Sequence, residues 1–399
     1  MRHFISLTAL AAAFVLSSCG EKAAEKTGGN ATLEGSLTNS SGDTIYFVDV
    51  SQRDFKVLDS AITDENGHFV FKPTVSHKGF YNISLAKDPQ QFTTVIMDKG
   101  DNITIKADAK NLGYSAAFTG SDESMHFMEF NKYFEEYEKR RSPLVSRLDS
   151  LQRAFQIQVG MMKDSNEVNK YEKEVIEPLF NATQDKITAM ADEGVVWVKA
   201  FIDKHPGSFA NIAALRLLDP FDNIDYWEKV VVALEAKHKD APNVVILRQL
   251  LDQEKPFCKG STPPDIEMNN PEGKPMKLSA LKGKIVLLDF WASWCGPCRN
   301  ELPNVVANYR KYNSKGFEVF SVSLDKEKQP WVDAIKKDGL AWQWHVSDLM
   351  YWNSPVVQQY RIQGIPKTLL LDREGKILDR DLRGPALGKK LDEIFAAAN

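Results

Sequence analysis

Two cysteines three positions apart are the residues of this chain best suited to chemistry. Cys295 and Cys298 enclose only a Gly-Pro dipeptide in the segment WASWCGPCRNELP. A thiol pair at this spacing can exchange electrons with another disulfide, bind a metal ion or form a structural disulfide. A zinc site needs two further ligands, and neither Cys19, Cys258 nor a neighbouring histidine provides them at a suitable spacing. Redox chemistry is the favoured prediction, a structural disulfide is the alternative, and no metal or cofactor is expected.

A buried strand and a helix are predicted to position this pair. The run KIVLLDF, residues 284–290, is apolar and rich in β-branched side chains, which is typical of a strand buried on both faces. Apolar residues then recur at helical spacing, so a helix should begin near Cys295. The unpaired N–H groups of that helix end favour a thiolate at Cys295. Cys295 is therefore predicted to attack a disulfide, and Cys298, one turn later, to resolve the mixed disulfide.

The segments LLDFWASWCGPCRNELP and YRIQGIPKTLLLDREGKIL resemble the thioredoxin superfamily, specifically the extracytoplasmic reductases of the TlpA/ResA kind. The resemblance covers about residues 262–399 and includes Trp294, which directly precedes the cysteine pair. It implies a thioredoxin-like α/β fold in which Pro366 is cis and faces the cysteines. In the family this proline exposes the backbone of the preceding residue, here Ile365, for pairing with an extended substrate segment. Lys367 departs from the threonine that thioredoxins usually carry.

Two acidic residues near the cysteines are candidate proton acceptors. Asp289 interrupts an apolar run, where an ionised carboxylate is costly unless its pKa rises. It matches the buried acid of thioredoxin, and Glu301 matches the acid used by the TlpA/ResA group. The alternatives are a polar strand end for Asp289 and an exposed helix residue for Glu301. Ser321 aligns where thioredoxin has a lysine near the acid. The predicted catalytic set is Cys295, Cys298, Asp289, Glu301, Pro366 and Trp294.

The composition of the whole chain is that of a soluble globular protein. Its 399 residues suffice for two or three domains, and 43% are hydrophobic and 26% charged. A net charge of −4 without a basic run argues against nucleic-acid binding. No apolar segment after the first twenty residues is long enough to span a membrane.

The N-terminus resembles a bacterial lipoprotein signal. A short basic start and an apolar stretch lead to Leu16-Ser-Ser-Cys19, which is similar to a lipobox. Residues 1–19 are therefore predicted to be a signal peptide, with lipidation at Cys19, and residues 20–30 a tether. An ordinary signal peptide with an incidental cysteine is the alternative. Gly20 favours outer-membrane sorting by family habit. Cys258 is left over, either as a buried thiol or as a third redox partner.

The segment between the tether and the redox domain is predicted to contain two regions. Residues 31–120 hold short β-rich runs separated by Gly/Asp/Asn turns, which favours an antiparallel β sandwich or barrel. They resemble a domain of unknown function that precedes thioredoxin modules in Bacteroidota lipoproteins. Residues 121–255 are predicted to be a helical spacer, with breaks at Ser142-Pro143, His205-Pro206-Gly207 and Ala241-Pro242. Residues 256–399 form the predicted thioredoxin-like domain.

Aromatic residues are concentrated around the cysteine pair. Six of the eight tryptophans fall between Trp291 and Trp352. Trp342, Trp344 and Trp352 could line a groove for a partner, although core packing is the expected role of at least two of them. His345, beside these tryptophans, is expected to be a partly buried residue rather than a base.

Together these features predict a lipid-anchored thiol–disulfide oxidoreductase at the periplasmic face of the outer membrane. Its partners are expected to be disulfide-containing envelope proteins and an integral membrane thiol electron donor. The Gly-Pro dipeptide is that of thioredoxin, whose potential is about −270 mV against about −120 mV for a dedicated oxidant, so reduction is the expected direction. The alternative is a lipoprotein that binds a partner or ligand and uses the thioredoxin fold as a scaffold. A peroxidase has no support, because those relatives use a different cysteine setting.

Overall fold

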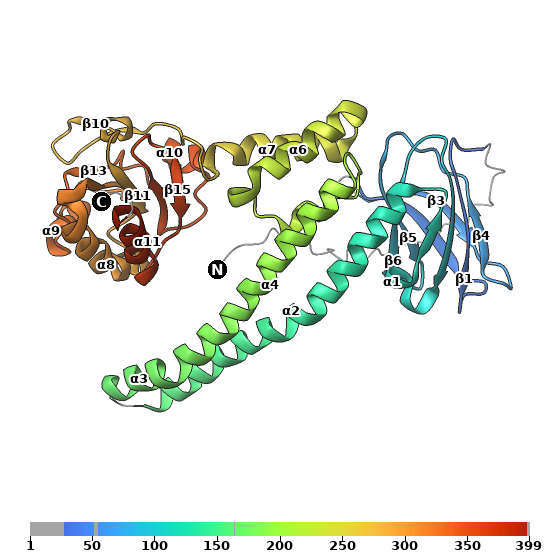
Figure 1. Cartoon of the computed structure of the whole chain (residues 1–399), viewed down its shortest axis with the longest axis horizontal. Coiled ribbons are helices and arrows are strands. Elements are labelled where there is room, and N and C mark those ends of the chain that lie inside the picture. Colours follow the sequence, from blue (N-terminus) through green and yellow to red (C-terminus); the bar gives the residue numbers. More distant parts are fainter. Residues whose placement is uncertain (1–27, 52–54, 163, 397–399) are drawn as a thin grey trace. The chain divides into compact units, whose positions relative to one another are not determined.

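A computed structural model describes residues 28–51, 55–162 and 164–396 (Figure 1). The described residues divide into two compact units, an N-terminal unit that comprises those up to residue 219 together with 225–251, and a C-terminal unit of residues 220–224 and 252–396. Cys19, the predicted signal peptide and most of the predicted tether lie outside the described residues. The proposed lipidation therefore stays a prediction.

The N-terminal unit begins with two four-stranded sheets. Their strands are β1 (Thr32–Thr38), β2 (Thr44–Asp49), β3 (Lys56–Ile62), β4 (His68–Phe71), β5 (Gly79–Leu85), β6 (Asp88–Met97), β7 (Asn102–Asp108) and β8 (Ala117–Thr119). One sheet has the order β4-β1-β7-β8 and the other β3-β2-β5-β6. Both sheets contribute buried side chains to one apolar core. Buried and less buried residues alternate along strands such as β5 and β7, as expected for strands with one face on a core.

The expectation of purely antiparallel pairing is wrong for one strand pair. Strands β1 and β7 run parallel, with Leu33 opposite Ile103 and Gly35 opposite Ile105. Parallel neighbours need a long connection, and here five other strands lie between the two in sequence. The β-rich character of the region is confirmed, whereas its description as a sandwich or barrel stays a prediction.

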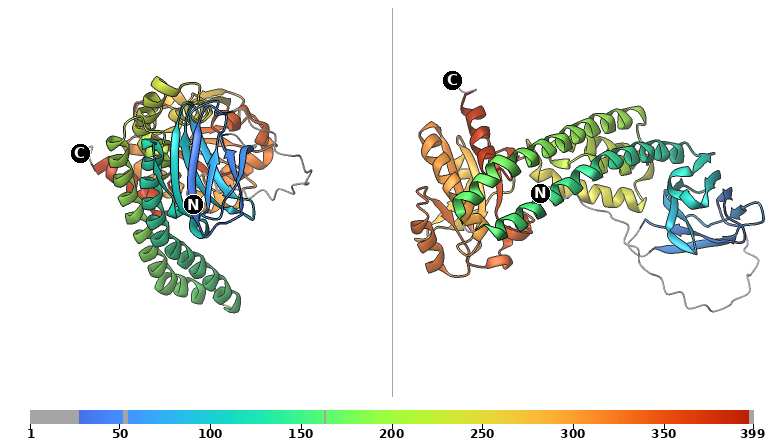
Figure 2. Two further views of the ribbon diagram at one scale, coloured as in Figure 1. Left: turned by 90° about the vertical axis from the view of Figure 1, so that its right-hand side faces the viewer. Right: turned by 90° about the horizontal axis from the view of Figure 1, so that it is seen from below.

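A long helical hairpin follows the sheets. The helices of this unit are α1 (Leu112–Ser115), α2 (Asp122–Met161), α3 (Ser165–Tyr171), the π-helical turn η2 (Glu172–Ile176), α4 (Glu177–Lys204), α5 (Asn211–Ala214), α6 (Pro220–His238) and α7 (Pro242–Glu254), of which α6 and α7 extend into the C-terminal unit. Helices α2 and α4 lie side by side over much of their length (Figures 1 and 2). The central helical segment is thereby confirmed.

One predicted helix break does not occur. Helix α2 continues through Pro143, which is exposed. A proline removes one backbone hydrogen bond from a helix, and the packing of α2 against α4 helps to hold the helix in place. The other two predicted breaks are confirmed, since α4 ends at Lys204 and α7 begins at Pro242.

The C-terminal unit is built on a five-stranded sheet of order β13-β12-β11-β14-β15. Its strands are β9 (Glu267–Asn269), β10 (Pro275–Lys277), β11 (Ile285–Trp291), β12 (Phe317–Ser323), β13 (Trp344–Val346), β14 (Lys367–Leu371) and β15 (Ile377–Arg380), of which β9 and β10 form a separate hairpin. Its helices are α8 (Gly296–Tyr312), α9 (Lys328–Lys337), α10 (Pro355–Gln359) and α11 (Pro385–Ala396). The expected thioredoxin-like α/β architecture is present at the C-terminal end.

Two apolar cores sandwich this sheet. Helices α8, α9 and α11 cover one face, and α10 with the β9-β10 hairpin covers the other. The central strand β11 pairs in parallel with β12 and antiparallel with β14, and all seven of its residues are buried. A strand with helices on both faces needs apolar side chains on both sides, which explains the unbroken apolar run that predicted it.

Candidate active site

The cysteine pair lies at the N-terminus of α8, directly after strand β11. Cys295 is the N-cap residue, and its Sγ accepts a hydrogen bond of 3.2 Å from the backbone N–H of Cys298. The two sulfurs form a disulfide with a Cα–Cα distance of 5.3 Å. Both residues are buried, with 5% of Cys295 and 2% of Cys298 exposed. The position of Cys295 agrees with the prediction, because backbone donors at a helix N-terminus stabilise negative charge on that sulfur.

The cis-proline lies beside the sulfur of Cys295, as the resemblance implied. The Ile365–Pro366 peptide bond is cis. The Sγ of Cys295 lies 3.8 Å from the carbonyl oxygen of Ile365. The backbone that would pair with an extended substrate segment is thus next to the sulfur that would react. Lys367, the departure from the usual threonine, forms an ion pair of 2.7 Å with Asp381.

Asp289 faces the helix that carries the cysteines. Leu287 and Trp291 on β11 belong to the core that contains Cys298, whereas Leu288 belongs to the core on the other face. Successive strand residues point to opposite faces, so Asp289 shares the face of Leu287 and Trp291. The sequence alone could not distinguish the faces, because every residue of this strand is buried.

A short row of buried polar residues crosses the sheet at this acid. Ser321 on β12 and Thr368 on β14 are the register neighbours of Asp289. The Ser321 hydroxyl accepts a hydrogen bond of 2.9 Å from the indole N–H of Trp342. Among the described residues, the Oδ2 of Asp289 and the Oγ1 of Thr368 have no hydrogen-bond partner. The carboxyl group therefore retains capacity to accept a proton.

The environment of Asp289 favours its protonated form. Burial raises the pKa of Asp289 to about 7, and the negative charge of Glu301 adds to this effect, while the positive charge of Arg383 opposes it. A carboxyl group with a pKa near neutrality can accept and release a proton at physiological pH. The rise that the apolar neighbours predicted is present, and the cation that opposes it lies 94 residues further along the chain.

Glu301 is not a simple exposed helix residue. Its side chain is half-buried, and its Oε1 accepts hydrogen bonds from the backbone N–H of Gly384 at 2.8 Å and from the amide of Asn304 at 2.6 Å. The same Asn304 amide donates to the carbonyl oxygen of Gly384 at 3.0 Å. Glu301 thereby attaches α8 to the loop before α11, and that loop carries Arg383.

Arg383 is a residue near the site that the sequence did not reveal. Its guanidinium donates a hydrogen bond of 2.6 Å to the carbonyl oxygen of Pro366. This places a positive charge against the cis-proline segment and within electrostatic reach of Asp289. No local sequence pattern distinguishes this arginine from the other surface arginines, so only the folded chain identifies it.

Asp325 anchors the turn before the cysteines and was also missed. It is buried, and its carboxylate accepts hydrogen bonds from the backbone N–H and the hydroxyl of Ser293 at 3.0 and 2.5 Å. The hydroxyl of Ser323 donates to the same carboxylate at 2.7 Å. A signal existed, because Asp325 follows β12, and the carboxyl ends of parallel neighbours meet at one edge of a sheet.

The tryptophans near the site divide between core and surface. Trp342 is buried, Trp344 and Trp352 are half-buried, and Trp294 is exposed. His345 is buried against Trp342, its Nε2 lies 3.3 Å from the Leu340 carbonyl oxygen, and burial lowers its pKa to about 4. A histidine that stays neutral inside the core fits the expectation that it is not the base.

The remaining cysteine lies apart from the pair in sequence. Cys258 is buried, and its thiol donates to the carbonyl oxygen of Glu254 at 3.2 Å. Its burial agrees with the favoured interpretation of a buried thiol, and a part in the redox chemistry stays the untested alternative. Within the described segments, no group of three or more His, Cys, Asp or Glu side chains is arranged to hold a metal ion. No helix in those segments is long and apolar enough to cross a membrane.

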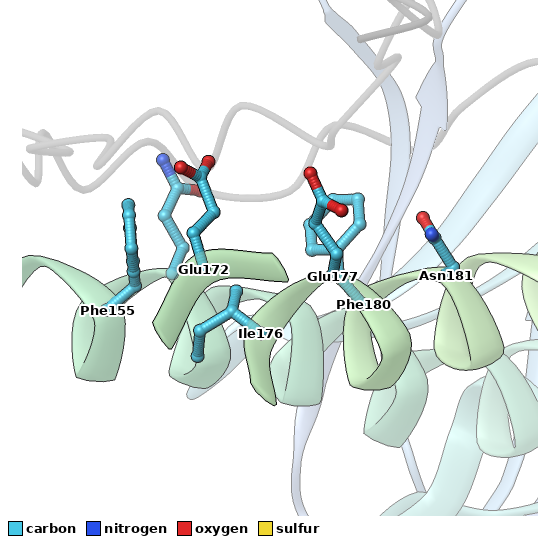
Figure 3. A pocket seen from close by; sticks show the side chains of 7 residues that line it. Phe155, Glu172, Ile176, Glu177, Phe180 and Asn181 are labelled. Carbon is cyan, nitrogen blue, oxygen red and sulfur yellow. The ribbon is translucent and has the colours of Figure 1, made fainter. Parts of the chain in front are cut away.

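The helical hairpin has a pocket of its own. It has a volume of about 210 Å³ and is lined by Gln152, Phe155, Glu172, Ile176, Glu177, Phe180 and Asn181. Figure 3 shows that the Glu172, Glu177 and Asn181 side chains point to the same side of the helices. None of the lining residues is a cysteine, serine or histidine, so this pocket offers no nucleophile and does not compete with the cysteine turn as the reactive site.

Both parts of the chain are similar to known proteins. Residues 260–380 match the model of the AhpC/TSA family, and residues 31–127 match a domain of unknown function, DUF4369. The chain is 31% identical over 122 residues to the thiol-disulfide oxidoreductase ResA of Bacillus subtilis, a match that covers 31% of this chain and 66% of that protein. It is 28% identical over 136 residues to ResA of a Bacillus thuringiensis strain, covering 34% of this chain and 76% of the relative.

Two solved structures from Bacteroides are also similar. The thioredoxin domain of a thiol-disulfide oxidoreductase from Bacteroides vulgatus is 34% identical, and the match covers 35% of this chain and 98% of that chain, with a TM-score of 0.33. The C-terminal domain of a putative thiol-disulfide oxidoreductase from Bacteroides thetaiotaomicron is 37% identical, with coverages of 35% and 97% and a TM-score of 0.33.

Proposed function

We propose that this chain, whose C-terminal domain belongs to the TlpA/ResA kind of thioredoxin-like thiol–disulfide oxidoreductases, is a membrane-anchored periplasmic enzyme that reduces protein disulfides through Cys295 and Cys298. The observation that carries the proposal is the sulfur of Cys295 at the helix N-terminus, bonded to Cys298 and 3.8 Å from the backbone of the cis-proline segment. The substrates are disulfide-containing envelope proteins.

The reaction consists of two exchanges. In the reduced enzyme, the Cys295 thiolate attacks one sulfur of the substrate disulfide, which forms a mixed disulfide and expels the other substrate sulfur as a thiolate. The thiolate of Cys298 then attacks the Sγ of Cys295 and expels the second substrate thiolate. The two electrons that reduce the substrate come from the cysteine pair, which ends as the disulfide. A dithiol donor in the membrane returns the pair to the reduced state.

Asp289 supplies the proton acceptor for the second exchange. Cys298 must lose its proton to become a nucleophile, and the raised pKa of Asp289 suits a carboxylate that takes a proton near pH 7. Burial is the main cause of that raised pKa, and the negative charge of Glu301 adds to it. Glu301 also holds the loop with Arg383 in place. Trp294 and Pro366 border the reacting sulfur and contact the bound substrate segment.

The insulin-reduction assay tests this function. With dithiothreitol as electron donor, the wild-type chain is expected to accelerate insulin reduction, and the Cys295→Ser/Cys298→Ser double variant is expected to leave the uncatalysed rate. The alternative, a lipoprotein that binds a partner on a thioredoxin scaffold, predicts equal rates for the two proteins. The preference for reduction over oxidation follows from the Gly-Pro dipeptide, which thioredoxin shares at a potential of about −270 mV.

Membrane attachment is the second part of the proposal. Leu16-Ser-Ser-Cys19 matches a lipobox, and acyl chains on Cys19 would hold the enzyme at the periplasmic face of the outer membrane. Cys19→Ala should move the protein from the membrane to the soluble fraction, whereas Cys258→Ala should leave its fractionation unchanged. Unchanged membrane association of Cys19→Ala would refute the anchor without affecting the redox assignment.

A further inference from the structure

Exposed large apolar side chains are concentrated at one place on the C-terminal unit. Among its described residues, 220–224 and 252–396, Trp294 and Met350 are the two large apolar residues that remain exposed, with exposed fractions of 47% and 48%. Trp294 directly precedes Cys295, and Met350 directly precedes Tyr351, whose ring contacts that of Trp294. The contact between the Tyr351 and Trp294 rings therefore brings the segment that carries Met350 next to the residue that precedes the reactive sulfur.

Three aromatic rings form the base of this surface. The ring centroids of Trp294 and Tyr351 lie 5.2 Å apart, those of Trp294 and Trp352 6.4 Å, and those of Tyr351 and Trp352 5.9 Å. Trp352 also packs against the core of the unit. We call Trp294, Met350, Tyr351 and Trp352 the aromatic shelf. The Nζ of Lys326 lies 4.5 Å from the centroid of the Tyr351 ring, so one edge of the shelf is positively charged.

The backbone of the loop that presents the shelf is held in an unfavourable conformation. Leu349 and Tyr351 both have a φ of 58°, in the left-handed region that side chains with a Cβ rarely adopt. The Asp348 carboxylate fixes the loop by accepting the backbone N–H of Met350 at 3.0 Å and the hydroxyl of the buried Ser354. Such outliers persist only where the surroundings impose them, and they cluster at ligand-contacting sites.

The substrate must approach the sulfur across this surface. The Sγ of Cys295 becomes bonded to a substrate cysteine, so the residues next to that cysteine come to lie near Trp294, its immediate neighbour in the chain. If the substrate residue next to its cysteine is bulky and apolar, its side chain can pack on the shelf, which removes the apolar surface of both from water. A small polar side chain leaves the shelf exposed, and a lysine meets the charge of Lys326.

We propose that the aromatic shelf selects substrates by binding a bulky apolar side chain adjacent to the substrate cysteine. The occupant is an extended segment of a partner protein in which Leu, Met or Phe flanks the reacting cysteine. This inference rests on the proposed function, because it names the substrate class of the same redox site. Continuity between the shelf and Cys295, rather than apolar character alone, assigns the surface to the substrate.

Three peptide disulfides test the selectivity. Each is the symmetric disulfide of Ac-Ser-X-Cys-X-Ser-NH2, with X as Phe, Ser or Lys, so that either flanking position can meet the shelf. The reduced full-length chain reduces one peptide disulfide to two thiols and becomes oxidised itself, and the second-order rate constant of this single turnover is measured. The Phe peptide is expected to react at least about tenfold faster than the Ser peptide, the usual range for one apolar contact. The Lys peptide should be slowest.

Variants of the shelf should remove the preference without removing the reaction. Met350→Ser and Tyr351→Asn should bring the Phe-to-Ser ratio close to one, because they slow the Phe peptide more than the Ser peptide. Asparagine tolerates the left-handed φ at position 351, so the loop can keep its conformation. Met125→Ser is the matched control, because Met125 is a similarly exposed methionine, 44% exposed, in the N-terminal unit. It should leave the ratio unchanged.

The outcomes separate this inference from the proposed function. Equal rates for the Phe and Ser peptides in the wild type would overturn the selection by the shelf and leave the reductase function standing. A wild-type preference that both shelf variants retain would also overturn it. If the wild type reduces neither the peptides nor insulin, the proposed function itself fails, and the inference fails with it.

Discussion

Each compact unit buries a carboxylate in a β-strand, and the two carboxylates differ in their hydrogen bonds. Asp59 on β3 is 7% exposed, and it accepts the backbone N–H groups of Ser60 at 2.8 Å and Lys72 at 3.0 Å. Asp289 on β11 is 4% exposed, and its Oδ2 has no hydrogen-bond partner among the described residues. A buried acid with satisfied oxygens belongs to the architecture of its sheet. A buried acid with an unsatisfied oxygen remains available for proton transfer.

The largest expected effect is on the pH dependence of stability. In the unfolded chain Asp289 ionises near its ordinary pKa of 3.8, whereas in the folded protein it keeps its proton up to about pH 7. Between these pH values the folded state binds more protons than the unfolded state, so the free energy of unfolding falls as the pH rises. The loss levels off above about pH 7, where Asp289 is ionised in both states. Asp289→Asn should therefore stabilise the oxidised protein at pH 7 by up to about 4 kcal/mol, with little effect near pH 4.

Denaturation followed by tryptophan fluorescence measures this difference. Six of the eight tryptophans lie between Trp291 and Trp352 and report on the C-terminal unit. Asp59→Asn is the matched control and should lower the free energy of unfolding, because an amide cannot accept hydrogen bonds from both backbone N–H groups. The expected loss is about 1–3 kcal/mol, and circular dichroism of the full chain measures it. Changes of the same sign in the free energy of unfolding for the two variants would contradict the distinction between the two carboxylates.

The second effect is on the rate of the resolving step. Asp289→Asn should slow the release of substrate from the mixed disulfide about a hundredfold, because Cys298 loses its proton acceptor. The wild-type rate should rise with pH through about pH 7, as Asp289 loses its proton. Stopped-flow release of the substrate thiol measures both. Asp59→Asn should leave the rate unchanged, and a wild-type rate for Asp289→Asn would make Asp289 a structural residue.

A smaller effect distinguishes the two charges near Asp289. Glu301→Gln removes the negative charge that raises the pKa of Asp289 but keeps an acceptor for the Gly384 N–H, so the pH midpoint of the resolving step should fall. Arg383→Gln removes the opposing positive charge, so the midpoint should rise. Each change should alter the rate at pH 7 by less than about tenfold.

The opposite signs of these two shifts are the informative result. Glu393→Gln, which neutralises an exposed glutamate on α11, is the control and should leave the midpoint in place. Shifts of Glu301→Gln and Arg383→Gln in the same direction would point to a general disturbance of the loop before α11 rather than to electrostatic control of Asp289.

The sequence predicted the parts of the site that local patterns encode. The continuous apolar run placed a buried strand before Cys295, and a cysteine at the start of a helical pattern predicted the N-cap position. Asp289 was identified because an acid in such a run has no solvent-facing position. The family resemblance added the cis bond at Pro366.

Long-range geometry supplied the rest. The hydrogen bond from Arg383 to Pro366 joins two loops whose approach depends on the sheet order, and nothing adjacent in sequence indicates it. The parallel pairing of β1 with β7 is equally nonlocal. The left-handed backbone at Leu349 was unpredictable for another reason, since leucine disfavours that conformation and tertiary contacts impose it.

Trapping of the mixed disulfide tests the central claim most directly. The reduced Cys298→Ser variant can attack a disulfide but cannot resolve the product, so incubation with insulin should give one covalent adduct through Cys295 that dithiothreitol releases, as identified by mass spectrometry. The Cys295→Ser variant should give no adduct. An adduct of the Cys295→Ser variant through Cys298 in equal yield would contradict the assignment of Cys295 as the attacking residue. The absence of an adduct with Cys298→Ser would also contradict it.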